Sequence, residues 1–381
     1  MPKVSHRGRV APFFAMEVLK AANEKAAAGG DVLHLEVGEP STGAPQAVIR
    51  HAQDIMNETH LGYTEALGVL PLRRAIAAHY ATSYGIELDP ERVVVTMGSS
   101  GAFLLAFTAA FDTGDRVALA TPGYPAYHNI LTAFGIEPLI LESGPEHRYQ
   151  PTPALLDKVV GRIDGLMVAS PANPTGSMVV GEALEQLIAY CRDRGIRLIS
   201  DEIYHGISYN APAETALGLT NDAIVINSFS KYFCMTGWRL GWMVLPEDLL
   251  RPIECLAQNM FVSPSALSQH AAIKVFDCRG ELDANVARYA ENRRVLLKEL
   301  PRAGFDRLAP ADGAFYIYAD IRKLANDSIE FSKRMLTETG VAATPGIDFD
   351  RDRGNSYMRF CFAGSTDNIR EASRRISGWL C

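Results

Sequence analysis

A lysine accompanied by two serines and an arginine is the most reactive-looking feature of this sequence. Lys231 follows the apolar run 223–226, which predicts a buried strand, and Ser228 and Ser230 lie just before it. Arg239 comes eight positions later, between glycines. The set suits an aldehyde cofactor with a phosphate, because an amine forms a Schiff base while hydroxyls and a guanidinium hold the phosphate. A solvated lysine at a strand end is the alternative.

A glycine–serine turn after the strand predicted over 92–97 is a second candidate for holding an anion. Ser99 and Ser100 lie in this turn, and the helix predicted over 102–111 follows it. The first N–H groups of a helix lack partners within the helix and carry the positive end of its dipole. A turn of this kind therefore suits a phosphate, although many strand-to-helix turns resemble it.

Asp201 and Asn173 also follow predicted strands. Asp201 comes directly after the strand predicted over 197–200. A carboxylate at a buried strand end needs a positive partner, which a protonated pyridine nitrogen would supply. The alternative for Asp201 is a helix N-cap. Asn173 lies in the turn 171–176, whose prolines and glycine predict a tight turn without explaining the asparagine.

Tyr124 and Arg359 complete the candidate residues. Tyr124 lies in a rigid turn after the strand predicted over 116–121 and could stack on a heteroaromatic ring, or belong to the core. Arg359 lies between apolar neighbours at the end of a C-terminal strand. Its planar fork suits a carboxylate, and a structural salt bridge is the alternative.

Alternating strands and helices must position these side chains. Between residues 90 and 245, short apolar runs alternate with helical patterns, which predicts a mostly parallel sheet covered on both faces. The predicted strands are 92–97, 116–121, 137–141, 165–170, 197–200, 223–227 and 240–245. Ligands of such sheets bind at the carboxyl ends of the strands, which is where the candidate residues of this region fall.

The remaining chain predicts a second, smaller unit. After residue 246 the pattern is helical (246–260, 265–276 and 282–299), and strands at 314–320 and 356–360 and a helix near 366–379 follow. A helix at 12–28 is expected to pack with this C-terminal part. We therefore expect a large domain at 45–285 and a small α+β domain formed by 1–44 and 286–381.

Composition narrows the possible partners. The 381 residues carry a net charge of −7 without a basic block, so nucleic acid is not an expected partner. No apolar run approaches the length of a membrane span, and no apolar stretch follows the positively charged start. Six cysteines lack disulfide or metal-ligand spacing. We expect a soluble cytoplasmic protein with reduced thiols and no metal.

The order of these segments resembles the class I/II aminotransferases that depend on pyridoxal 5'-phosphate (PLP), in the aspartate aminotransferase-like superfamily. The resemblance extends over residues 10–380 and implies a seven-stranded, mostly parallel sheet sandwiched by helices, with a small α+β domain from both chain ends. It implies transfer of an amino group from an L-amino acid to a 2-oxo acid through a Lys231 Schiff base, with ping-pong kinetics.

The resemblance also assigns a role to each candidate residue. Lys231, Asp201 and Tyr204 are the implied catalytic residues, with Asp201 on the pyridine nitrogen and Tyr204 and Asn173 on the phenolic oxygen of PLP. Tyr124 would stack on the ring. The phosphate would be held by Ser99, Ser100, Ser228, Ser230 and Arg239.

Substrate binding and assembly are implied in the same way. Gly38, Asn173 and Arg359 would hold the substrate carboxylate. Tyr63 matches the tyrosine that reaches the phosphate of the neighbouring subunit's cofactor, which implies a homodimer with a shared active site. The sequence offers no basic residue for a second substrate carboxylate, so we expect a neutral or aromatic donor, with 2-oxoglutarate or pyruvate as acceptor.

Two other functions use the same residues. A PLP-dependent C–S β-lyase, or another reaction of an α-amino acid, would need the same lysine, aspartate and arginine. A non-catalytic effector sensor is disfavoured, because the motifs extend from about residue 37 to 360 and leave no room for a DNA-binding module.

Overall fold

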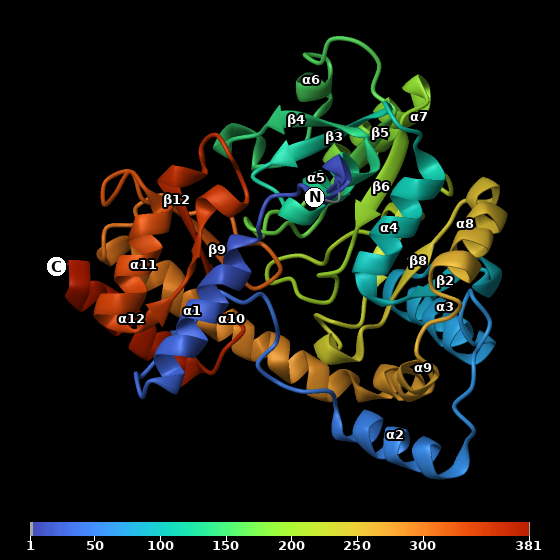
Figure 1. Ribbon diagram of the computed structural model, residues 1–381, viewed down its shortest axis with the longest axis horizontal. Coiled ribbons are helices and arrows are strands. Elements are labelled where there is room, and N and C mark those ends of the chain that lie inside the picture. The colour runs from blue at the N-terminus through green and yellow to red at the C-terminus, as the bar shows by residue number, and fades with distance from the viewer. Residues whose placement is uncertain (1–2, 381) are drawn as a thin grey trace.

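A seven-stranded sheet runs through the middle of the computed structural model, which describes residues 3–380 (Figure 1). The strand order is β2-β8-β7-β6-β5-β3-β4, and β8 alone runs antiparallel to its neighbours in this sheet. The strands are β2 (Val93–Thr96), β3 (Arg116–Thr121), β4 (Glu137–Glu142), β5 (Gly165–Ala169), β6 (Arg197–Asp201), β7 (Ile224–Ser228) and β8 (Gly241–Val244). The predicted mostly parallel sheet is confirmed.

Both faces of this sheet are buried under helices. In β2, Val93 and Val95 belong to one apolar cluster and Val94 belongs to another on the opposite face, as side chains alternate along a strand. The first cluster includes residues of α2 (Gln46–Glu58), α3 (Leu70–Tyr84), α7 (Glu182–Arg194) and α9 (Ala266–Ala272). The second includes residues of α4 (Gly98–Ala110), α5 (Pro125–Phe134) and α8 (Glu247–Met260). Burial on both faces explains why the central strands of this sheet are mostly apolar.

Several predicted helices differ from the structure at their ends, and the helix predicted over 282–299 is α10 (Arg279–Arg302). The helix predicted from residue 102 begins at Gly98, so the glycine–serine turn forms its first turn. Gly98 has a φ of +69°, a backbone conformation that glycine adopts without strain. The helix predicted over 265–276 ends as α9 at Ala272 and continues as a 3-10 helix, Ile273–Cys278. Four helices are absent from the sequence-based expectation: α2, α3, the short α6 (Pro153–Leu156) and α11 (Ser328–Thr339).

A second sheet is built from the C-terminal part of the chain. Its antiparallel order is β11-β12-β9, with β9 (Tyr316–Asp320), β11 (Thr344–Pro345) and β12 (Tyr357–Cys361). Beside it, β1 (Leu33–His34) pairs in parallel with β10 (Val341–Ala342). The helices of this part are α1 (Phe14–Ala27), α11 (Ser328–Thr339) and α12 (Thr366–Leu380). In Figure 1, α1 lies beside these C-terminal elements.

Polar contacts join the first helix to the C-terminal part. The N–H groups of Phe14 and Ala15 donate to the Asp348 carboxylate at 3.0 and 3.1 Å, and Lys25 Nζ donates to the Leu336 carbonyl at 2.8 Å. The boundary predicted at residue 285 falls within the unbroken helix α10 (Arg279–Arg302). The division into two domains stays a prediction.

The described residues also bear on the expectations about membrane spans and cysteines. Within residues 3–380, no helix has both the length and the apolar character that a membrane crossing requires. The cysteines within that range are all free thiols, and Cys381 lies outside the described residues.

Candidate active site

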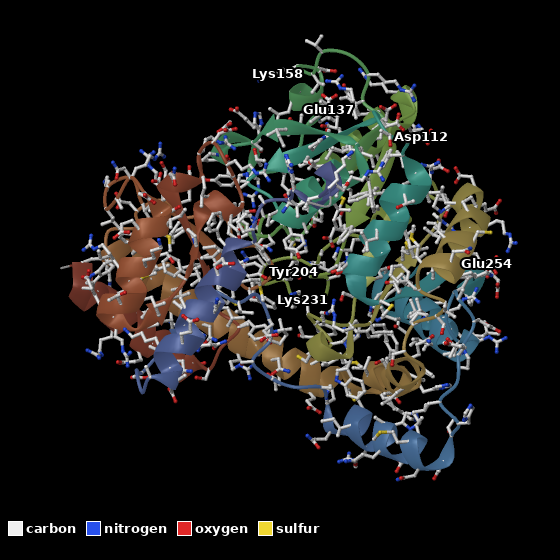
Figure 2. The ribbon with its side chains drawn as sticks, viewed as in Figure 1. Asp112, Glu137, Lys158, Tyr204, Lys231 and Glu254 are labelled. Atoms are coloured by element: carbon white, nitrogen blue, oxygen red, sulfur yellow. The ribbon has the colours of Figure 1, made fainter. Side chains whose placement is uncertain are left out.

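A cavity of about 210 Å³ opens where the central sheet meets the second sheet. It receives residues that follow β2, β5, β6 and β7, together with residues of β9, β12 and the segment 37–39. Every predicted site residue lines it except Ser228 and Tyr63. Figure 2 shows Tyr204 and Lys231 close together in the middle of the molecule, whereas Asp112, Glu137 and Glu254 lie at its edge.

Lys231 lies in the turn after β7 and is partly buried. Its Nζ donates to the Gly38 carbonyl oxygen at 2.5 Å and lies 5.7 Å from the ring centroid of Tyr204. Burial lowers the pKa of this amine to about 8. A larger fraction of the amine is therefore neutral near pH 7 than in a solvated lysine, which favours its use as a nucleophile and a base.

Asp201 ends β6 and is only 2% exposed. Its carboxylate accepts hydrogen bonds from the Tyr127 hydroxyl and from the Ile203 N–H, the latter at 3.0 Å. No helix begins here, so Asp201 is not a helix N-cap. Burial raises its pKa to about 6, and none of the described residues forms an ion pair with it. A cationic ligand atom would supply the missing partner.

Arg359 lies in β12 and is 1% exposed. Its Nη1 donates to Asn173 Oδ1 at 3.0 Å, and its Nη2 donates to Thr344 Oγ1 at 3.1 Å and to the Glu36 carbonyl. Its Nε has no partner among the described residues. No described carboxylate lies within ion-pair distance, which removes the salt-bridge alternative. A buried cation without an anion fits a negatively charged ligand.

The first turn of α4 and Arg239 form the other positive part of the cavity. A Cβ on Gly98 would lie 2.6 Å from Arg239 Nη2, so the missing side chain lets the guanidinium reach the helix end. Arg239 Nη1 donates to the Thr236 carbonyl at 3.0 Å, and the described residues offer it no ion pair. Free N–H groups beside an unpaired arginine suit a phosphate.

Three other predicted site residues, Tyr204, Tyr124 and Ser228, differ in their contacts. Tyr204 places its hydroxyl oxygen 2.7 Å from that of Tyr316. Tyr124 is partly exposed at the cavity and also packs against the second apolar cluster of the central sheet, and its ring lies edge-on against Phe13. Ser228 instead accepts from the Ser230 N–H at 3.0 Å inside the turn.

Three residues that sequence reasoning missed contact this site. Tyr127 donates to Asp201. Its place in the sequence was the available signal, because it lies on α5 three residues after the candidate Tyr124. Tyr316 lies so close to Gly38 that a Cβ there would be 2.0 Å from its hydroxyl oxygen. Thr344 holds Arg359. No local pattern marks Tyr316 or Thr344, because both reach the site through pairing in the second sheet.

Comparison with known proteins identifies the family. The model of aminotransferase class I and II matches residues 30–376. A valine–pyruvate aminotransferase of Mycobacterium tuberculosis is 48% identical, over 99% of this chain and 98% of its own length. A crystal structure of an aminotransferase from Mycobacterium tuberculosis has a TM-score of 0.98 and 48% identity, covering 100% of this chain and 99% of that one.

A crystal structure of a putative aminotransferase from Silicibacter pomeroyi is similar to the same degree. Its TM-score is 0.94 and its identity is 49%, and the match covers 100% of this chain and 99% of that one. The family match and both relatives extend over nearly the whole chain. The chain therefore belongs to the class I and II aminotransferases, enzymes that transfer an amino group between an amino acid and a 2-oxo acid.

Proposed function

We propose that this transaminase uses PLP held through Lys231, with a neutral aliphatic amino acid such as valine as donor and pyruvate as acceptor. Enzymes of its family depend on PLP. The observation that carries the donor class is the small number of cations at the cavity. Among the described lining residues these are Lys231, Arg239 and Arg359. Lys231 and Arg239 would be used by the aldehyde and the phosphate of PLP, so only Arg359 remains for a substrate carboxylate.

Three features of the chain fit the ring nitrogen, the phosphate and the aldehyde of PLP. Asp201 is a buried carboxylate without a cation, which suits the protonated ring nitrogen. The first turn of α4 and Arg239 suit the phosphate. Lys231 suits the aldehyde, because burial lowers its pKa. When bound, PLP would supply an electron sink for the bond broken at the substrate α-carbon.

The chain's own residues would then orient the substrate and move its proton. Arg359 would bind the α-carboxylate through Nε, which has no protein partner among the described residues. Lys231, neutral in part because its pKa is about 8, would move the proton from the donor's α-carbon to the aldehyde carbon of PLP. In the second half of the reaction it would move a proton in the reverse direction, to the α-carbon of the acceptor. The first product would leave before the second substrate binds, which gives ping-pong kinetics.

The residues that line the cavity favour a substrate with a neutral side chain. Phe13, Met16 and Ile203 line the cavity with apolar atoms, and Glu39 adds a negative charge. A second carboxylate would be buried there without a cation, which costs several kcal/mol unless it is paired. The name of the Mycobacterium tuberculosis relative, a valine–pyruvate aminotransferase, agrees with this choice.

A matrix of donors and acceptors tests the proposal. The purified enzyme with PLP is assayed with valine, alanine, phenylalanine, aspartate and glutamate against pyruvate and 2-oxoglutarate. We expect kcat/KM for valine with pyruvate to exceed that for aspartate by about 100-fold, since an unpaired buried charge costs several kcal/mol. Comparable values for aspartate would overturn the donor class. A preparation that neither binds PLP nor shows its visible absorbance would overturn the cofactor.

We further infer a homodimer in which Tyr63 serves the partner's site. Tyr63 is 88% exposed and does not line the cavity of its own chain. Leu61, Met260 and Val262 are also exposed, and the Thr64 N–H donates to Ser263 Oγ at 3.3 Å, which brings the two segments together. Apolar side chains gathered on a surface favour contact with another chain.

Mixing two inactive variants tests this assembly. Tyr63→Ala and Lys231→Ala are combined, unfolded and refolded together. A mixed dimer then contains one site with both native residues, so activity should return to about a quarter of the parent value by random pairing. Sedimentation checks that dimers form. Mixed dimers without recovered activity would show that Tyr63 does not act across subunits.

A further inference from the structure

Thr344 connects Arg359 to the N-terminal segment at the cavity. Its side chain is fully buried. The hydroxyl oxygen accepts from Arg359 Nη2 at 3.1 Å and donates to the Glu36 carbonyl at 2.9 Å. Arg359 Nη2 also donates to that carbonyl. A guanidinium nitrogen, a hydroxyl and a carbonyl oxygen thus form a closed ring of hydrogen bonds.

Strand pairing determines this arrangement. β11 and β12 are antiparallel, with Thr344 directly opposite Arg359, so both side chains leave the sheet on the same face. The Glu36 carbonyl is fixed as well, because the adjacent Leu35 donates to Ala342 at 2.9 Å and accepts from Cys361 at 2.7 Å. Neither end of the ring can move without breaking backbone hydrogen bonds.

The ring limits which N–H groups of Arg359 are available to a ligand. A guanidinium has five N–H donors in a rigid plane. Nη2 is used by Thr344 and Glu36, and one Nη1 hydrogen is used by Asn173. Nε and the second Nη1 hydrogen remain. The Thr344 hydroxyl proton is directed at the Glu36 carbonyl, so a lone pair of the hydroxyl oxygen faces Nη2. The Arg359 guanidinium is therefore held in one orientation.

We propose that Thr344 is a positioning residue for the substrate carboxylate. Its hydroxyl sets the orientation of the Arg359 fork and ties it to the segment whose Gly38 carbonyl accepts from Lys231. The proposal rests on the carboxylate role of Arg359 proposed above. Thr344 does not line the cavity, so it acts only through Arg359.

Thr344→Val removes the hydroxyl and keeps the shape of the side chain. We expect KM for valine and for pyruvate to rise about 10- to 100-fold, as for lost hydrogen bonds to a charged group, while kcat changes less than about 3-fold. Binding of isovalerate, which has the carboxylate of valine without its amine, should weaken by the same factor in calorimetry of the enzyme with PLP. Thr344→Ser keeps the hydroxyl and should restore both values.

Controls separate this role from a general effect on the fold. Thr82→Val removes a hydroxyl that bonds only to its own helix and should leave KM and isovalerate binding unchanged. Turnover of isobutylamine, which has no carboxylate, should not respond to Thr344→Val. If that variant fails to fold, Thr344→Ala compared with Thr344→Ser gives the same test.

The outcomes distinguish the positioning role of Thr344 from the proposed binding of the substrate carboxylate by Arg359. If Thr344→Val leaves KM and isovalerate binding unchanged while Arg359→Lys weakens both, Thr344 has no positioning role and the carboxylate site stands. If Arg359→Lys also leaves both unchanged, the proposed carboxylate site itself is wrong. Equal losses for the Val and Ser variants would assign Thr344 a packing role and reject the proposal.

Discussion

The two walls of the cavity are built in different ways. The wall on the central sheet carries Ser99, Asn173, Asp201 and Lys231, which follow or end β2, β5, β6 and β7. The opposite wall carries Gly38, Tyr316 and Arg359, supported by Thr344. Its residues come from segments hundreds of positions apart, which meet because β1 pairs with β10 and β12 lies between β11 and β9.

The difference lies in how each wall depends on register. Parallel strands end at one edge of a sheet, so a residue just past such a strand reaches that edge even if its exact pairing changes little. In the second sheet, a shift of one residue between β11 and β12 would separate Thr344 from Arg359 and turn one of them to the other face. We therefore expect the first wall to tolerate changes outside its functional groups and the second to depend on close packing.

The largest effect should come from the first wall. Lys231→Ala removes the amine proposed to hold PLP and move the proton, so kcat should fall about 10⁴-fold or more, at the upper end of what a positioned base contributes. Initial rates with valine and pyruvate measure this, and the visible absorbance of PLP should change with it. Lys158→Ala, an exposed lysine labelled in Figure 2, should behave as the parent. Appreciable activity of Lys231→Ala would remove the central assignment.

The next effect concerns pH and Asp201. Its pKa of about 6 in the folded enzyme without PLP lies above the usual 3.8. The folded state therefore holds the proton more tightly, and this contribution to stability, complete below about pH 4, is lost as the pH rises through 6. It amounts to about 3 kcal/mol at most, at 1.4 kcal/mol per pKa unit.

Comparison of two proteins isolates that contribution. Urea unfolding between pH 4 and 7 should show a steeper decline in the parent apoenzyme than in Asp201→Asn, which keeps the contribution of Glu202, whose pKa burial raises to about 7. With PLP bound, a cationic ring nitrogen would lower the pKa of Asp201 and remove this difference. A parent enzyme whose pH profile coincides with that of Asp201→Asn, with and without PLP, would contradict the buried, unpaired carboxylate.

A smaller effect tests the packing of the second wall. Gly38→Ala would place a Cβ 2.0 Å from the Tyr316 hydroxyl oxygen, which should cost about 1–3 kcal/mol of unfolding free energy, as overpacking does. Tyr316→Phe in the same chain removes that oxygen and should recover part of the loss, since Cζ would still lie 2.9 Å away. Urea midpoints measure both changes.

A matched glycine serves as the control for this packing. A Cβ added to Gly43 would meet no atom within 4 Å, so Gly43→Ala should leave the urea midpoint unchanged. If Gly38→Ala is as stable as Gly43→Ala, the residues around Tyr316 can shift to accommodate the added Cβ at little cost in free energy. The contrast between the two walls would then need to be abandoned.

Residues at strand ends were predictable because local signals were sufficient. The apolar run before Lys231 and the turn around Asn173 indicated both the element and its edge. The sequence predicts the start of α4 four residues late, because its glycine–serine turn has the composition of a loop while its backbone forms the first helical turn. The roles of these residues toward PLP stay predictions.

By itself, the sequence determined the alternation of strands and helices, the family and the candidate residues at one edge of the sheet. These depend on patterns spanning a few residues, in which burial and turn chemistry act locally. Only the tertiary structure decided that Tyr316 lies against Gly38 and that Thr344 holds Arg359. These contacts depend on the pairing of distant segments, whose register follows from the packing of the whole second sheet.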